Sequence, residues 1–315
     1  MSSLGSISSR TPRRATVINQ IHNTENDTIE IPQALLFWWN VSMSVFHAFF
    51  LIITLSLATP DLSVNVYKTS IWFQVLINGT YITVDDNKPN ATNVFRLVPY
   101  YERTNGLNIT ILAASFFALS SLFHFLNAMP LRSFYIRELQ HCRTPTRWVE
   151  YFFSAPVMFV LIAYGLGIRD RSLLIATATL IATTMPFGYW VEVIARPKTP
   201  NEWCLPLHRR IYPWFLGHIP QTVAWSLVIL SFYDNSWNVS EIPWFVHVIL
   251  WAELFLFFSF GAASFVSQLG PPSKFYIGEL IFQVLSLVSK GLLGFLLLQN
   301  VLMLSEFDEI YEDSV

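Results

Sequence analysis

The chain has 315 residues, of which 53% are hydrophobic, 16% are aromatic and only 13% are charged. This composition is too apolar for an ordinary soluble domain and indicates an integral protein of the lipid bilayer. The net charge is −2, and no basic face with interleaved aromatic residues is present, so nothing points to nucleic-acid binding.

The first 33 residues form a polar tail without a hydrophobic stretch, so we expect no cleavable signal peptide and a disordered segment. Beyond it, seven segments have the roughly 20 apolar residues that cross a bilayer as a helix. They cover residues 34–58, 107–129, 147–168, 173–194, 213–232, 243–266 and 277–304. The sequence therefore predicts an all-α membrane protein with one seven-helix domain over 34–304, followed by an acidic tail over 305–315.

The connection between the first two spans, residues 59–106, is unusually long for a helical bundle. It contains the alternating stretches VNVYKTSIWFQVLI and TYITV on either side of an NGT turn. Alternation with a period of two, interrupted by Asn-Gly, is typical of a β-hairpin. We therefore expect a hairpin in this loop.

The distribution of basic residues predicts the orientation in the membrane, because Lys and Arg are retained on the cytoplasmic side. A cytoplasmic N-terminus places twelve basic residues inside and six outside. The inside set is Arg10, Arg13, Arg14, Arg132, Arg137, Arg143, Arg147, Arg196, Lys198, Arg209, Arg210 and Lys274. The C-terminus is then extracellular or lumenal, which disfavours G-protein-coupled receptors and the common microbial rhodopsins.

Glycosylation sequons and cysteines agree with this orientation. Four sequons fall outside the cell, at Asn78, Asn90, Asn108 and Asn238, whereas those at Asn26 and Asn40 should be unused. Both cysteines, Cys142 and Cys204, fall on the reducing cytoplasmic side, so we expect no disulfide.

Ionisable residues within a span are costly and are therefore candidates for function. They are His47, His124, Glu150, Glu192, Glu253, Glu279 and Lys290. Lys290 lies deep in QVLSLVSKGLLGFLLLQN, too far from either end for its ammonium to reach the headgroups. Burial favours the neutral amine, which condenses with an aldehyde. Ser286 lies one turn earlier, and Gly291 and Gly294 leave room for a bulky aldehyde bound to the lysine. The simpler alternative is that Lys290 forms a structural ion pair with a buried glutamate.

A cationic adduct needs an anion, and two glutamates are candidates. In RWVEYFFS, Arg147, Glu150 and Ser154 share one helix face, which could hold the carboxylate ionised, although an Arg–Glu pair at the membrane interface is the simpler interpretation. Depth counted along the helices instead favours Glu253, because Glu150 is only about 7 Å inside its helix and Lys290 about 20 Å inside its own.

The other polar and aromatic groups give weaker signals. His47 and His124 could form a proton-accepting cluster, but their spacing matches no metal motif, so no metal site is expected. Glu192 is expected near the cytoplasmic interface. Aromatic side chains of the fifth and sixth spans could wall a flat conjugated ligand; they include Trp214, Phe215, Trp225, Phe257, Phe258 and Phe260.

Together these residues resemble the heliorhodopsin family, seven-helix retinal proteins with a cytoplasmic N-terminus. SLVSK at 286–290 resembles the family's retinal-binding pattern, which implies that Lys290 carries all-trans retinal as a protonated Schiff base beside Ser286. RWVEY at 147–151 implies that Glu150 is the counterion, with Arg147 as its neighbour. The resemblance also assigns His47 and His124 to a polar cavity and TTMPFGYWVE at 183–192 to the retinal-lining segment. Further pocket residues on this basis are Tyr151, Met185, Gly188, Trp214, Phe215, Phe257 and Phe258.

The resemblance implies a photoreceptor rather than an enzyme, with a slow photocycle, no pumping and an unknown signalling partner. It also implies a homodimer to which the first loop contributes. The alternative is light-gated proton conduction through Glu150, Glu253 and the two histidines. A third possibility is a chromophore-free helical receptor or membrane enzyme.

Overall fold

The computed structural model describes residues 30–77, 80–83, 95–104, 106–195, 208, 211–236, 242–270 and 272–302. Among them, seven helices are long and apolar enough to cross a membrane, which confirms the predicted bundle. They are α2 (Gln33–Leu57), α3 (Ile109–Ala128), α5 (Pro145–Gly165), α6 (Arg171–Ala195), α9 (Tyr212–Ser236), α10 (Trp244–Leu269) and α11 (Phe275–Leu297). A π-helical turn, η2 (Leu298–Leu302), continues α11.

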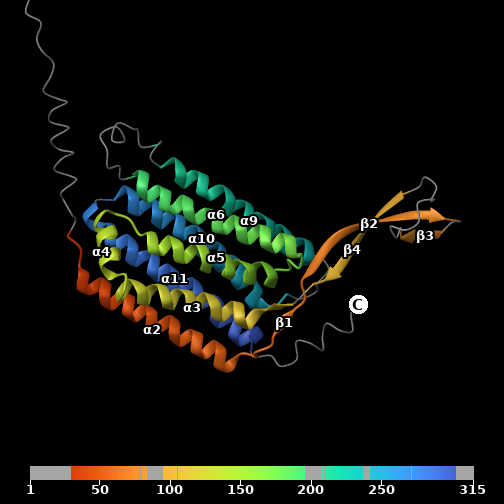
Figure 1. Ribbon diagram of the computed structural model, residues 1–315, viewed down its shortest axis with the longest axis horizontal. Helices are drawn as coiled ribbons and strands as arrows, with labels where there is room; N and C mark the ends of the chain where they lie inside the picture. Colours follow the sequence, from red (N-terminus) through yellow and green to blue (C-terminus); the bar gives the residue numbers. More distant parts are fainter. Residues whose placement is uncertain are drawn as a thin grey trace, which may run out of the picture.

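The helices run side by side along the long axis of the molecule (Figure 1). Neighbouring pairs in the packing are α2 with α3, α3 with α5, α5 with α6, α6 with α9, and α10 with α11. The helices α5 and α11 have the largest buried shares of the seven. Polar side chains on these two helices therefore lie inside the bundle rather than on its surface.

One end of the bundle carries a short helix, α4 (Arg132–Gln140), which was not predicted from the sequence. We call this end the α4 end; α5 and α11 begin there, and a 3₁₀ turn, η1 (Pro272–Lys274), precedes α11. Burial of Tyr135, Ile136 and Leu139 on one face holds α4 against the bundle.

The opposite end, the hairpin end, carries a β-sheet that projects away from the helices (Figure 1). The predicted hairpin is confirmed: β2 (Tyr67–Ile77) pairs antiparallel with β3 (Thr80–Thr83). A third strand that was not predicted, β4 (Phe95–Arg103), pairs with the other edge of β2, giving the order β3-β2-β4. Two short strands, β1 (Ser63–Val64) and β5 (Leu107–Asn108), pair at the base.

Asp170 attaches the sheet to the helices, together with a backbone hydrogen bond from the Tyr67 N–H to the Arg169 carbonyl at 2.9 Å. Asp170, which precedes α6, accepts hydrogen bonds from the Thr69 hydroxyl at 2.6 Å and from the Leu173 backbone N–H at 2.9 Å. Partial burial raises the pKa of Asp170, but the hydrogen bonds from Thr69 and Leu173 outweigh it and hold the pKa below its ordinary value. Asp170 therefore caps α6 and fixes β2 at the same time.

Several predictions fall wholly or partly on residues outside the described ranges. These are the two tails, Cys204 and the sequons at Asn26, Asn78, Asn90 and Asn238. Asn40 is 1% exposed, inside the bundle. Asn108 caps α3, and its side chain also donates a hydrogen bond to the Pro60 carbonyl at 2.9 Å.

Candidate functional site

Lys290 lies in the centre of α11 with only 3% of its surface exposed. Its Nζ is 2.7 Å from Oε1 of Glu150 on α5, so the two form a buried ion pair. Ser120 on α3 joins them, because its hydroxyl accepts a hydrogen bond from Lys290 and donates one to Glu150 Oε1 at 2.7 Å. Sequence reasoning missed Ser120, which lies 170 positions from Lys290 along the chain.

The depth estimate that favoured Glu253 as the ion-pair partner of Lys290 is wrong in the structure. Both helices begin two residues before the expected starts at 147 and 277, at Pro145 and Phe275, and Glu150 reaches the lysine. The count measured each residue from the first residue of its own helix, and the contact between Lys290 and Glu150 means that these two starting points are not at one common depth.

Glu253 lies in the same region without contacting the lysine nitrogen. Its Oε2 accepts a hydrogen bond of 2.6 Å from Ser289, the residue before Lys290, and its surface is fully buried.

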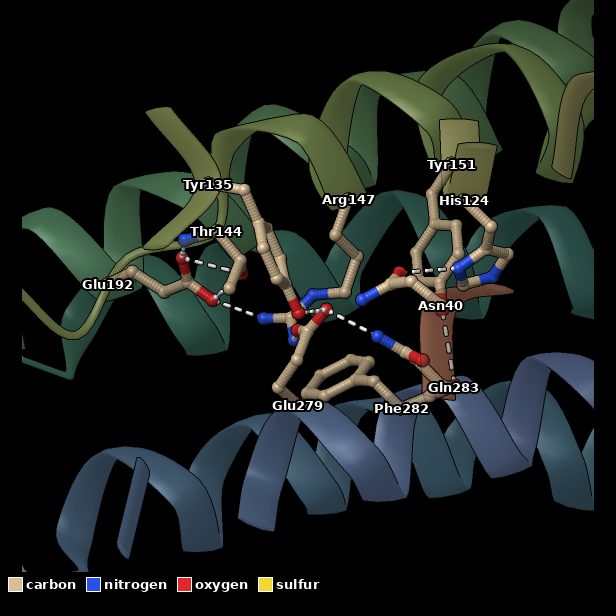
Figure 2. A network of polar contacts seen from close by, with 10 residues as sticks. All are labelled: Asn40, His124, Tyr135, Thr144, Arg147, Tyr151, Glu192, Glu279, Phe282 and Gln283. Carbon is tan, nitrogen blue, oxygen red and sulfur yellow. Dashed lines mark hydrogen bonds and ion pairs between the residues drawn. The ribbon is translucent and has the colours of Figure 1, made fainter. Parts of the chain in front are cut away.

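Arg147 does not pair with Glu150, contrary to the interpretation of RWVE as a local Arg–Glu pair. Its guanidinium forms buried ion pairs with Glu192 on α6 and Glu279 on α11, as Figure 2 shows. Glu192, which was expected near the cytoplasmic interface, lies close to the end of α6 and is 1% exposed. A single arginine thus links the α4 ends of three helices, and the simpler expectation failed because arginine's length lets it reach past its own helix face.

Further hydrogen bonds complete this network (Figure 2). The Thr144 backbone N–H donates to Glu192 at 2.7 Å, and the Thr144 hydroxyl also donates to that carboxylate. Tyr135 on α4 and Gln283 donate to Glu279 Oε1 at 3.2 and 3.0 Å. Burial and the charge of Glu279 raise the pKa of Tyr135 well above its ordinary value, so it remains a donor.

The two histidines are neighbours, as the polar-cavity assignment expected. Their rings stack with centroids 5.7 Å apart, and His124 Nδ1 lies 2.9 Å from the Asn40 side-chain oxygen. His124 follows Ser120 by one turn of α3, so the pair adjoins the Lys290 site. Within the described ranges, no group of three His, Cys, Asp or Glu residues could hold a metal ion.

A cavity extends from Lys290 between α5, α6, α9, α10 and α11. Of the residues assigned to the site by sequence, it is lined by Tyr151, Ser154, Met185, Gly188, Trp214, Phe257, Ser286 and Lys290. Phe260, one of the aromatic residues named from the sixth span, also lines it. Unpredicted lining residues include Trp148, Met158, Gln221 and Phe282.

Three of the predicted pocket aromatics do not line the cavity. Trp225 is buried and packs against Phe159 and Phe257 instead. Phe215 is 52% exposed on the outside of the bundle, and Phe258 is only half-buried and packs near the His218 ring. Phe215 and Phe258 each follow a lining residue directly, and consecutive side chains of a helix point about 100° apart. Trp214 and Phe257 face the cavity, so their successors face away from it.

A family model described as Heliorhodopsin matches residues 36–302 of the chain. The chain belongs to the heliorhodopsin family. A similar solved structure is the crystal structure of thermophilic rhodopsin from Rubrobacter xylanophilus, with 12% identity, a TM-score of 0.51, and coverage of 85% of this chain and 95% of that one. At this identity the likeness shows the fold alone. Comparison with curated protein sequences found no match.

Membership of the heliorhodopsin family makes the chain an integral multi-pass membrane protein and implies a retinal chromophore and a response to light. The cavity fits such a group. It is lined mainly by aromatic and aliphatic side chains, which suit a conjugated hydrocarbon, and a lysine suited to an aldehyde lies at its edge. The Ser154 hydroxyl also lines it, fully buried and without a hydrogen-bond partner in the described part of the chain.

Proposed function

We propose that the protein is a light sensor in which retinal, all-trans in the dark, is bound to Lys290 as a protonated Schiff base with Glu150 as its counterion. The observation that carries this proposal is the buried contact of 2.7 Å between Lys290 Nζ and Glu150 Oε1 at the edge of an aromatic cavity. A buried cation is stable only when it is paired and hydrogen-bonded. Glu150 supplies the charge and Ser120 the additional hydrogen bonds.

When bound, retinal would supply absorption of visible light and an isomerisation that displaces the groups around it. The chain's own residues would then move the proton. Ser120 touches both the lysine nitrogen and Glu150, so it can pass a proton between them. His124, one turn further along α3, and His47, stacked on it, can accept that proton. Phe282 and Tyr151 line the cavity, with the Tyr151 ring 5.3 Å from Lys290 Nζ, and their rings would help to exclude water.

Three further features belong to this proposal. The excess of basic residues in the loops on one side supports a cytoplasmic N-terminus and an extracellular or lumenal C-terminus. The family resemblance supports a homodimer, and the projecting sheet offers a surface for it. A sensor without pumping activity also needs a signalling partner. We also propose that the protein is not an enzyme.

The direct test is visible absorbance after addition of retinal to the purified full-length chain. Wild type should develop a visible band, and Lys290→Ala should not. Lys274→Ala is the matched control, because it removes an exposed lysine before α11 and should leave the band unchanged. A visible band of normal strength in Lys290→Ala would refute the attachment site and favour a chromophore-free receptor or membrane enzyme.

A second candidate function is light-gated proton conduction. The observation that favours it is the presence of carboxyl groups on two sides of Lys290, Glu150 from α5 and Glu253 from α10 next to Ser289. Photocurrents in a voltage-clamped cell separate the two functions. A sensor gives no current at any holding potential, whereas a conductor gives a current that reverses with the proton gradient.

A further inference from the structure

Four glutamates are almost fully buried within the spanning helices. They are Glu150, Glu192, Glu253 and Glu279, all at most 4% exposed. Three of them contact a cation: the first pairs with Lys290, and the second and fourth share Arg147. Within the described residues, Glu253 has no lysine, arginine or histidine at ion-pair distance, although it is the most deeply buried of the four.

The surroundings of Glu253 favour a neutral acid over a carboxylate. The single hydrogen bond at this side chain joins Ser289 Oγ to Oε2 at 2.6 Å, and Oε1 has no partner in the described part of the chain. Its neighbours on α10 include the buried Leu250 and Phe257. An ionised carboxylate with one hydrogen bond in such an environment is far more costly than the protonated form. Glu253 therefore holds a proton.

The protonated Glu253 lies in the same region of the bundle as Lys290. Ser289 directly precedes the lysine, and both line the cavity. The helix α10 runs from the hairpin end toward the α4 end, so Glu253 is one turn nearer the hairpin end than Phe257, which also lines the cavity. Glu150 lies near the start of α5, at the α4 end. Glu150, which is ionised, and Glu253, which is neutral, thus approach the region of Lys290 from different helices and from opposite ends of the bundle.

We propose that Glu253 is a second carboxyl group of the Lys290 site, neutral in the dark, which returns a proton to the lysine nitrogen through Ser289. In this step the O–H bond of Glu253 breaks and an N–H bond forms at Lys290, after that nitrogen has given its own proton to the Ser120 side. Glu253 is left as a carboxylate and regains a proton from the hairpin end. The inference rests on the proposed function, because it needs a nitrogen that loses a proton after light absorption.

The test uses the full-length chain with retinal and measures flash-induced absorbance and the light-minus-dark infrared spectrum. Wild type should show loss of a protonated-carboxyl carbonyl band during the photocycle, and Glu253→Gln should lack that change. Recovery of the dark absorbance should slow by about 10²-fold in this variant, the usual contribution of a positioned general acid. A small weak acid in the buffer should restore the rate, which a purely structural role of Glu253 would not predict.

Ser289→Ala provides a second arm of the test. It should retain the band at a shifted frequency, because the carboxyl group loses its hydrogen bond, and it should recover more slowly than wild type. An unchanged band and an unchanged recovery in either variant would overturn the role of Glu253. Absence of any visible pigment in wild type would instead refute the proposed function, so the two failures are distinguishable.

Discussion

Removing the negative charge of Glu150 should directly weaken the protonated form of the Lys290–retinal linkage. Glu150→Gln retains the size of the side chain but removes the negative charge from a pair whose side chains are only 3% and 5% exposed. Breaking a buried ion pair by removing one partner costs about 3–5 kcal/mol. Since 1.36 kcal/mol corresponds to one pH unit, the protonated form of the Lys290–retinal linkage should be lost about 2.2–3.7 pH units lower than in wild type.

The assay is an absorbance titration of the retinal-bound protein, following the visible band as the pH rises. Glu279→Gln is the matched control, because Glu279 is equally buried but pairs with Arg147 and not with Lys290. In this control the midpoint should move by less than about one pH unit. A midpoint in Glu150→Gln that equals that of wild type would refute the reasoning and assign the counter-charge to another residue.

Three further predictions concern the surroundings of the site. Arg147→Gln leaves two buried carboxylates without a cation, so it should lower the free energy of unfolding by at least about 3 kcal/mol in denaturant titrations. Arg137 is exposed, so the control Arg137→Gln should change the free energy of unfolding by less than about 1 kcal/mol. Gly188→Ala puts a methyl group onto a neighbouring indole ring that lines the cavity, so the pigment yield should fall; Gly165→Ala, which meets no atom within 4 Å, should form pigment as wild type does. The pKa of Asp170 in the folded protein lies below its ordinary value of 3.8, so the ionised carboxylate stabilises the fold above pH 3.8, and this stabilisation is lost as the pH falls through the folded-state pKa. Amide hydrogen exchange at β2 should therefore accelerate below pH 3.8 in wild type, and Asp170→Asn should remove this pH dependence. An exchange profile in acid that is identical in the variant and in wild type would contradict the role of Asp170.

The bundle and the hairpin could be predicted because each depends on local sequence. Apolar runs of bilayer length define the spans, and an Asn-Gly turn between alternating strands defines a hairpin. The strand β4 was missed because its pairing partner β2 lies across a long connection and because it contains Pro99. The helix α4 was missed because its nine residues include several polar ones and its stability comes from packing on the bundle.

In the site, Lys290 could be found from sequence because a lone lysine in an apolar helix is rare. Its contacts could not be derived in the same way. Ser120 is one of many serines, and only the packing of α3 against α5 and α11 brings it to the ion pair. Arg147 reaches Glu192 and Glu279 on other helices instead of its neighbour Glu150, which helical spacing does not reveal.

The central claim is that retinal attaches to Lys290, and chemical trapping of the linkage tests it most directly. The retinal-bound full-length protein would be reduced with borohydride, which converts an imine to a stable secondary amine, and then digested for peptide mass mapping. We predict one modified peptide, carrying the retinyl group on Lys290. A retinyl group on another lysine, or a visible pigment that leaves Lys290 unmodified after reduction, would contradict the account.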